Sequence, residues 1–137
     1  MNTKLLMTLS AIFMAAIGVG LTFLPKEIAD LTGIGPSKTL QLILQISGAL
    51  YFAFAMLNWM AKGSIIGGIY NKPIATANFT HFVIGALALV KILINDHSLP
   101  YPIWTLAGIY SIFAVLFGLV FFGDPVSDSA SLNTKTT

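Results

Sequence analysis

The sequence predicts an all-α fold, an integral membrane four-helix bundle, and three observations lead to this prediction. Four apolar stretches of 20 to 23 residues occur along the chain. Each is long enough to cross the roughly 30 Å hydrocarbon core of a bilayer as a helix. Hydrophobic residues make up 56% of the chain and charged residues only 9%, against about 25% charged in an ordinary soluble domain. A soluble fold of this size could neither bury so much apolar surface nor solvate itself with so few charges.

Charge and cysteine content exclude several functional classes. The formal net charge is only +2, and all seven basic residues are lysines spread along the chain, which argues against a nucleic-acid-binding surface. The sequence contains no cysteine, which excludes disulfides, thiolate catalysis and cysteine-ligated metals.

The first predicted helix covers residues 5–24, after a short basic start that ends at Lys4. A basic start and an apolar run also describe a secretory signal peptide, whose apolar region is normally about 7–15 residues long and ends at a small-residue cleavage site. Here the run is longer and leads directly into Pro25, so we expect a retained helix. The polar connector that follows should contain a short interfacial helix, started by Pro25 and ended by Gly33.

Three further membrane helices are expected at residues 39–61, 73–95 and 103–123. Pro100 and Pro102 act as breakers in the turn before the last of them. Residues 124–137 are rich in Ser, Thr, Asn and Asp, and we expect a disordered polar tail there. The expected organisation is therefore one four-transmembrane-helix domain, residues 1–123, followed by this tail.

Each predicted helix carries a stripe of small or polar residues that should face the bundle interior. Small and polar groups gain from contact between membrane helices, whereas Leu and Ile gain little over contact with lipid. The four stripes are Ala11/Ala15/Gly18/Thr22, Gly48/Phe52/Ala55, Asn78/His81/Gly85/Ala88 and Gly108/Ser111/Val115/Gly118.

The distribution of lysines predicts the orientation in the membrane. With four spans, both termini and the loop between the second and third helices lie on one side. That side collects four lysines: Lys4, Lys62, Lys72 and Lys135. The loops on the other side contain only Lys26 and Lys38. The positive-inside rule then predicts a multi-pass protein of the cell inner membrane with both termini cytoplasmic.

Five residues within the spans form the candidate ligand-binding site: Tyr51, Asn58, Asn78, His81 and Lys91. The second and third helices run in opposite directions, so their residues match in depth in reverse order. Counting about 1.5 Å per residue puts Asn58 level with Asn78, and Tyr51 within a turn of His81. An intramembrane histidine is by default a functional-site candidate.

Each of the two ionisable residues of this set also has a purely structural interpretation. His81 can be a neutral imidazole that ties its helix to Tyr51, Ser10 or Tyr110 by a hydrogen bond. Lys91 lies four residues from the end of its predicted helix and can snorkel to the interface. In the functional interpretation its ammonium faces inward, against Gln41 and Gln45 or an outer acid such as Asp30, and holds an anionic or carbonyl ligand.

The spans offer little for catalysis, metals or cofactors. The only other histidine, His97, falls in the turn after the third helix, and the spans contain no Asp or Glu that could complete a metal site. No catalytic residue, metal site or cofactor is therefore expected.

Two segments carry a resemblance to a known group of proteins. Gly18 precedes Phe23-Leu24-Pro25 at the exit of the first helix, and Gly48-Ala49-Leu50-Tyr51 precedes Leu57-Asn58-Trp59 in the second. With the chain length and the four spans, this pattern resembles the small four-helix bacterial membrane proteins called DoxX-like. The resemblance covers most of the chain and implies no catalytic residue.

Two functions of different classes follow from these features. The first is a non-enzymatic integral inner-membrane protein, an accessory or stabilising subunit of a larger membrane complex, with the lipid bilayer and a membrane protein or a second copy of the chain as partners. The alternative is a small-molecule or lipid-binding protein or transporter component with a polar cavity around His81. A membrane enzyme is the third and weakest hypothesis.

Overall fold

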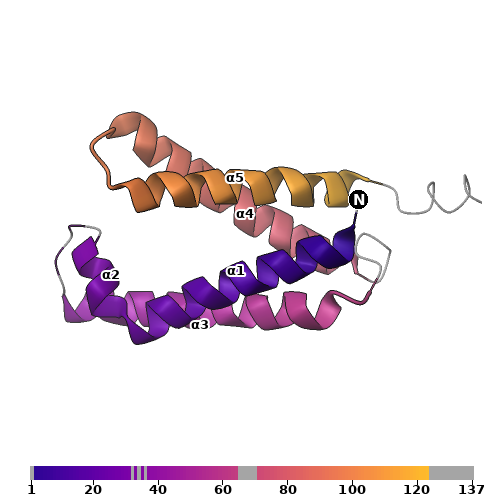
Figure 1. Ribbon diagram of the computed structural model, residues 1–137, viewed down its shortest axis with the longest axis horizontal. Helices are drawn as coiled ribbons and strands as arrows, with labels where there is room; N and C mark the ends of the chain where they lie inside the picture. The colour runs from indigo at the N-terminus through magenta and orange to yellow at the C-terminus, as the bar shows by residue number, and fades with distance from the viewer. Residues whose placement is uncertain (1, 32, 34, 36, 65–70, 124–137) are drawn as a thin grey trace, which may run out of the picture. The chain divides into compact units, whose positions relative to one another are not determined.

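The computed structural model describes residues 2–31, 33, 35, 37–64 and 71–123, and five helices make up almost all of this part of the chain (Figure 1). The helices are α1 (Thr3–Phe23), α2 (Pro25–Leu31), α3 (Lys38–Ala61), α4 (Lys72–Asn95) and α5 (Tyr101–Phe122). No strand occurs among the described residues. The predicted all-α fold class is confirmed.

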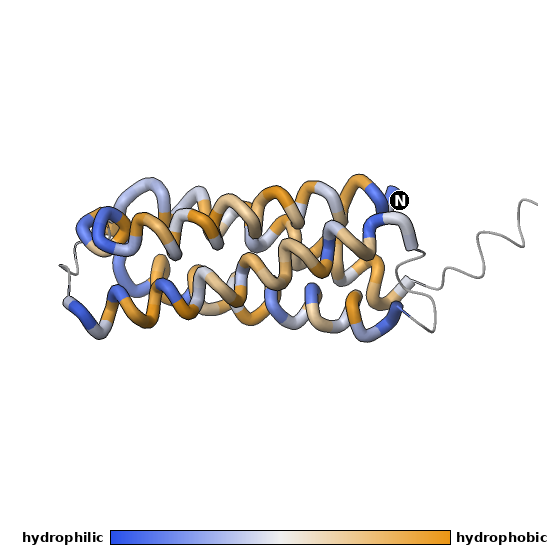
Figure 2. The backbone as a smooth tube through the Cα atoms, turned by 90° about the horizontal axis from the view of Figure 1, so that it is seen from below, coloured by the Kyte–Doolittle hydropathy of each residue, from blue (hydrophilic) through white to orange (hydrophobic). Residues whose placement is uncertain are grey.

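Four of the helices, α1, α3, α4 and α5, are long and apolar enough to cross a membrane. Their lengths are 21, 24, 24 and 22 residues, and the hydropathy along their central parts is high. Figure 2 shows the apolar residues following the lengths of these helices, with hydrophilic residues concentrated near the helix ends. The chain is therefore a multi-pass membrane protein.

The helix boundaries follow from local capping. The side chain of Asn2 accepts a hydrogen bond from the backbone N–H of Leu5, and that of Ser37 accepts one from Leu40, each at 3.1 Å. These side chains satisfy N–H groups that the first turns of α1 and α3 leave unpaired. The short helix α2 begins at Pro25 as expected, and Gly33 follows it with a φ of +74°, a conformation that glycine adopts readily.

The start of α5 differs from the sequence-based expectation. We expected Pro102 to lie in the turn before the helix, but α5 begins at Tyr101 and contains Pro102 in its first turn. Proline is compatible with this position because the N–H that it lacks would have no partner within the helix.

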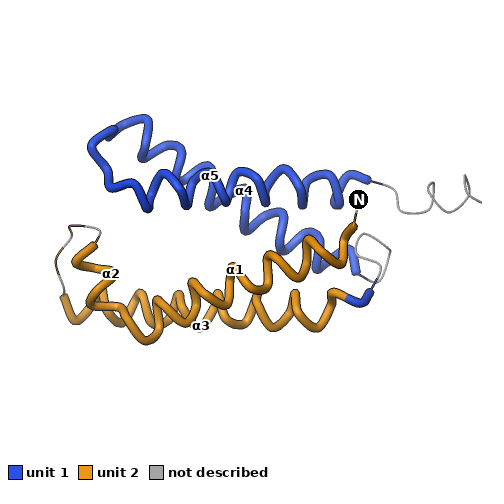
Figure 3. Tube along the Cα trace, in the orientation of Figure 1, with its two compact units in different colours: residues 1, 63–137 blue, residues 2–62 orange. Residues whose placement is uncertain are grey.

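The described residues form two compact units, which Figure 3 colours separately. Residues 2–62, with helices α1 to α3, are called the first unit here and are orange (unit 2) in Figure 3. The second unit begins at residue 63, contains α4 and α5 and is blue (unit 1) in the figure. The expectation of one domain over residues 1–123 combines both units and stays a prediction. The predicted tail, residues 124–137, lies outside the described residues.

In the first unit, α1 and α3 pack antiparallel with their backbones in close contact at two glycines. A Cβ atom on Gly18 would lie 2.8 Å from the backbone nitrogen of Phe52 and 2.9 Å from the carbonyl oxygen of Gly48. A Cβ atom on Gly48 would lie 2.8 Å from the carbonyl oxygen of Gly18. Glycine at both positions is what allows this approach, as the small-residue stripes of these two helices predicted.

In the second unit, aromatic rings fill the contact between α4 and α5. Phe82 is fully buried and stacks on Phe113 and Phe117, with ring centroids 4.8 and 5.5 Å apart. The predicted stripe of α5 is wrong at Gly108 and Val115, both of which are exposed. The stripes of α3 and α4 are likewise wrong at Phe52 and Ala88, which are exposed as well. Helix α5 is rotated so that its aromatic residues face α4, because glycine on α4 leaves room for a ring.

Candidate functional site

Asn58 is fully buried in the first unit and joins α3 to α1. Its Nδ2 donates a hydrogen bond of 3.0 Å to the hydroxyl oxygen of Ser10, which is also fully buried. The Ser10 hydroxyl in turn donates to the carbonyl oxygen of Met7 at 3.0 Å. The sulfur of Met14 lies 3.7 Å from the same Asn58 nitrogen. This chain of polar groups satisfies Asn58 within an apolar surrounding, where an unpaired amide would be costly.

His81 lies on α4 and is tied to α5. Its Nε2 and the hydroxyl of Tyr110 lie 3.2 Å apart, and the tautomer of the imidazole decides which of the two donates. Tyr110 was one of three partners that the sequence offered for His81, and the structure confirms this one. The tyrosine is 2% exposed, so its hydroxyl needs a partner within the protein.

Gly85 provides the space that brings Tyr110 to His81. A Cβ atom at Gly85 would collide with the ring of Tyr110, because the ring lies directly against the α4 backbone one turn after His81. Gly85 is therefore a positioning residue for the pair. The sequence predicted that Gly85 lies on the same stripe as His81. Its contact with the Tyr110 ring depends on the rotation of α5, which the sequence did not predict.

Asn78 is fully buried on α4, less than one turn before His81. Its Nδ2 donates a hydrogen bond of 3.0 Å to the carbonyl oxygen of Ile74, one turn earlier in the same helix. Asn78 and His81 share one face of α4, as their spacing of three residues predicted.

The remaining two residues of the predicted site, Tyr51 and Lys91, lie on different helices. Tyr51 is half-buried on α3, two turns before Asn58. Lys91 is exposed near the end of α4 and, ten residues after His81, lies about 15 Å further along the helix axis. Its exposure agrees with the snorkelling interpretation. The single cavity predicted for all five residues combines side chains of both units and stays a prediction.

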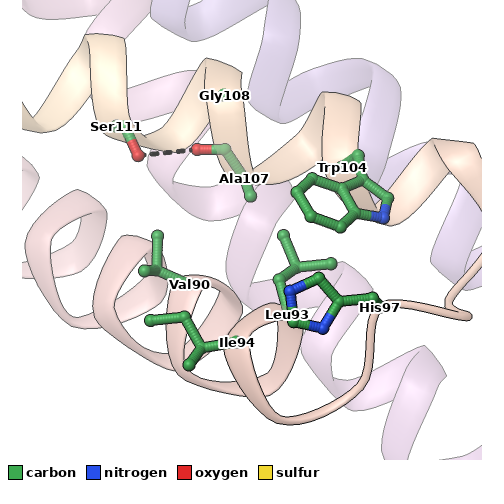
Figure 4. A pocket seen from close by; sticks show the side chains of 8 residues that line it. All are labelled: Val90, Leu93, Ile94, His97, Trp104, Ala107, Gly108 and Ser111. Carbon is green, nitrogen blue, oxygen red and sulfur yellow. Dashed lines mark hydrogen bonds between the residues drawn. The ribbon is translucent and has the colours of Figure 1, made fainter.

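A groove that the sequence did not indicate lies between the end of α4 and the start of α5 (Figure 4). Its volume is about 340 Å³, and most of its lining is aliphatic. Polar groups come from His97, Trp104 and Ser111. The rings of His97 and Trp104 lie 6.3 Å apart, and the Ser111 hydroxyl donates to the carbonyl oxygen of Ala107 at 2.8 Å. None of the five predicted site residues lines this groove.

In the turn after α4, the carboxylate of Asp96 accepts two hydrogen bonds from Ser98. An Asp96 side-chain oxygen accepts hydrogen bonds from the hydroxyl of Ser98 at 2.6 Å and from its backbone N–H at 2.9 Å. The Ser98 hydroxyl, with a further contribution from the Ser98 N–H, holds the pKa of Asp96 below its usual range. Asp96 thus stabilises the turn that follows α4.

Among the described residues, no three His, Cys, Asp or Glu side chains gather where they could hold a metal ion. Asn58, Asn78 and His81, which lie within the spans, instead make the hydrogen bonds described above.

Comparison with known proteins adds no assignment: no family model, no curated protein and no solved structure matches this chain.

Proposed function

We propose that this chain is a non-enzymatic accessory or stabilising subunit of a larger membrane complex in the cell inner membrane. The observation that carries the proposal is the position of Gln45, an amide side chain exposed within a membrane-spanning helix.

Gln45 lies eight residues into α3, well inside the span. The side chain has no hydrogen-bond partner in the part of the chain that the structure describes. Lipid tails offer an amide no partner either, so a glutamine in this position is stabilised when a neighbouring helix supplies one. An amide exposed to hydrocarbon therefore favours a second protein on this side of α3.

The surroundings of Gln45 suit the approach of another helix. Ala49 and Ala53 are exposed one and two turns further along α3, which leaves a surface of small side chains next to the amide. We call Gln45, Ala49 and Ala53 the α3 strip. Small residues at such spacing let membrane helices come close together. Of the four membrane helices, α3 is also the least covered: 11% of the residues in its most apolar stretch are buried, against 33% for α1 and α5.

The use of the buried polar residues supports a non-enzymatic role. Asn58 holds α1 to α3 and His81 holds α4 to α5, so these groups already serve the packing of the chain. The DoxX-like resemblance is part of the same proposal and adds no chemistry to it. The proposed orientation, with both termini cytoplasmic, rests on the lysines alone.

Photocrosslinking at the α3 strip tests the proposal. A photoreactive amino acid placed at Ala49 should give, in native membranes, an adduct with a distinct protein of defined mass. Gln45→Leu should abolish this adduct, because the amide loses its hydrogen-bonding groups. Thr80→Val, which removes an exposed hydroxyl from α4, is the matched control and should leave the adduct unchanged.

Two results would contradict the proposal. One is an adduct at Ala49 with lipid only. The other is an adduct that contains only a second copy of this chain, which would indicate a homo-oligomer instead of a subunit of a larger complex.

A further inference from the structure

A second groove lies wholly within the first unit, between α1 and α3, and has a volume of about 300 Å³. Its walls are apolar and include Ala11, Ile12 and Ala15 of α1 and Phe52, Met56 and Trp59 of α3. Four of these side chains are about half exposed: Ile12 is 56% exposed, and Phe52, Met56 and Trp59 are 46–47% exposed. The groove is therefore accessible from the surroundings of the helices, which in a membrane are lipid chains.

The groove follows α3 from Phe52 to Trp59, a distance of about 10 Å along the helix axis. Trp59 lies two residues before the end of α3, the depth at which tryptophan marks the interface between the hydrocarbon and the headgroups. A lipid chain in this groove would thus begin at the interface and run toward the middle of the membrane.

Two lysines lie at the interfacial end of the groove. The Nζ atom of Lys62 lies over the Trp59 ring, 3.0 Å from its centroid, so this ammonium is held beside the groove. Lys4 precedes Ala11 by seven residues, which places it on the face of α1 that lines the groove. Because α1 and α3 are antiparallel, with Ser10 bonded to Asn58, the start of α1 and the end of α3 lie at the same end of the unit.

The carboxylates of the first unit lie far from these lysines. Its only acidic residues, Glu27 and Asp30, belong to α2, which follows the other end of α1. The interfacial end of the groove is therefore positively charged with no nearby carboxylate within the unit to neutralise it. An apolar groove with a cationic end complements a molecule that has a hydrocarbon chain and a negative head.

We propose that the groove between α1 and α3 binds an acyl chain of an anionic phospholipid, with the lipid phosphate between Lys4 and Lys62. The site goes beyond the proposed subunit function, because it needs neither Gln45 nor a protein partner. The two lysines make it selective for net negative charge. A zwitterionic phospholipid offers the same chains and phosphate, but its own ammonium or choline group offsets the phosphate. Each basic residue near an anionic headgroup corresponds to about a five-fold preference.

Fluorescence quenching in lipid vesicles tests this site in the full chain. Trp59 and Trp104 are the only tryptophans, so Trp104→Phe leaves Trp59 as the sole indole reporter at the groove. The protein is placed in phosphatidylcholine vesicles that contain either brominated-chain phosphatidylglycerol or brominated-chain phosphatidylcholine, and bromine quenches the indole when the labelled chain occupies the groove.

In this background, phosphatidylglycerol should quench Trp59 at several-fold lower mole fraction than phosphatidylcholine. Lys4→Gln and Lys62→Gln should each reduce the preference by about five-fold at most, and the double variant should show none. Lys4→Gln is the cleaner variant, since Lys62→Gln also removes the contact with Trp59. Ala15→Phe, which fills the groove, should reduce quenching by both lipids while circular dichroism confirms the helical fold.

The matched control is the double variant Lys26→Gln and Lys38→Gln, which removes two lysines at the other end of the same unit. It should keep the full preference. Equal quenching by the two lipids in the chain with all its lysines would overturn the proposal. So would a preference that survives in the Lys4 and Lys62 double variant, or one that the Lys26 and Lys38 control loses equally.

Discussion

The hydroxyl of Tyr110 and Nε2 of His81 lie 3.2 Å apart and connect α5 to α4 within the membrane-spanning part of the second unit. The contact exists because Gly85 lets the tyrosine ring lie against α4. A histidine in a membrane helix invites a catalytic or transport interpretation. Here its geometry is that of a hydrogen bond between two helices, and this relationship leads to two predictions.

The first prediction concerns the strength of the pair. His81→Leu and Tyr110→Phe should each weaken the protein by about 0.6–2 kcal/mol, the range found for hydrogen bonds between membrane helices. His81→Gln keeps a donor and an acceptor and should be tolerated. The free energy of unfolding in detergent, measured for the two single variants and the double variant, isolates the coupling between the side chains. Strictly additive effects would show that the two residues are not coupled. Loss of a cellular phenotype in His81→Gln at full stability would assign the imidazole a functional role.

The second prediction compares two glycines of the second unit. Gly85→Ala should destabilise the protein by about 1–3 kcal/mol, because the new Cβ atom meets the ring of Tyr110 and forces the helices apart. Gly108→Ala is the matched control, since nothing lies within 4 Å of a Cβ atom there. It should be neutral or stabilising by about 0.4–1 kcal/mol, as alanine restricts the unfolded chain. Equal effects of the two substitutions on the free energy of unfolding would contradict the packing of Tyr110 on α4.

The sequence predicted the helices well because membrane spans depend on length and hydropathy, which can be read locally. Residues 39–61 and 73–95 were each expected within one residue of α3 and α4. The error at α5 came from treating Pro102 as a breaker, although the first turn of a helix accepts proline. Capping by Asn2 and Ser37 fixed starts that hydropathy alone leaves uncertain by a residue or two.

Helix rotation was harder to predict than helix position. The stripe rule works for α1, where Ala11 and Gly18 are buried, because small residues there let two backbones meet. It failed for α5, whose buried side is formed by Tyr110, Phe113 and Phe117. In this unit glycine on one helix receives a large ring from the other, so the small residues of the two helices need not face each other. The partner of His81 could be narrowed to three residues from the sequence, but the rotation of α5 decided among them.

The third prediction concerns the turn between α4 and α5. The pKa of Asp96 is held below its usual range by the Ser98 hydroxyl and N–H, so the ionised form favours the closed turn. The stabilisation that the ionised Asp96 gives the turn is fully present above pH 4 or so, about the pKa of this carboxyl group in the unfolded chain. The stabilisation is lost as the pH falls through the lower pKa that the group has in the folded chain. Ser98→Ala should move the midpoint upward, toward that of an ordinary aspartate, in an NMR titration of the Asp96 carboxyl group. An unchanged midpoint would contradict the role of the hydroxyl.

The fourth prediction tests the central claim, that four helices cross the membrane with both termini on the cytoplasmic side. Because the chain contains no cysteine, single cysteines can be introduced without background labelling. Ser64→Cys lies after α3 and Ser98→Cys lies between α4 and α5. With a membrane-impermeant maleimide, the account predicts that Ser98→Cys is labelled in intact spheroplasts and Ser64→Cys only after lysis. Labelling of both positions from the same side of the membrane would contradict it.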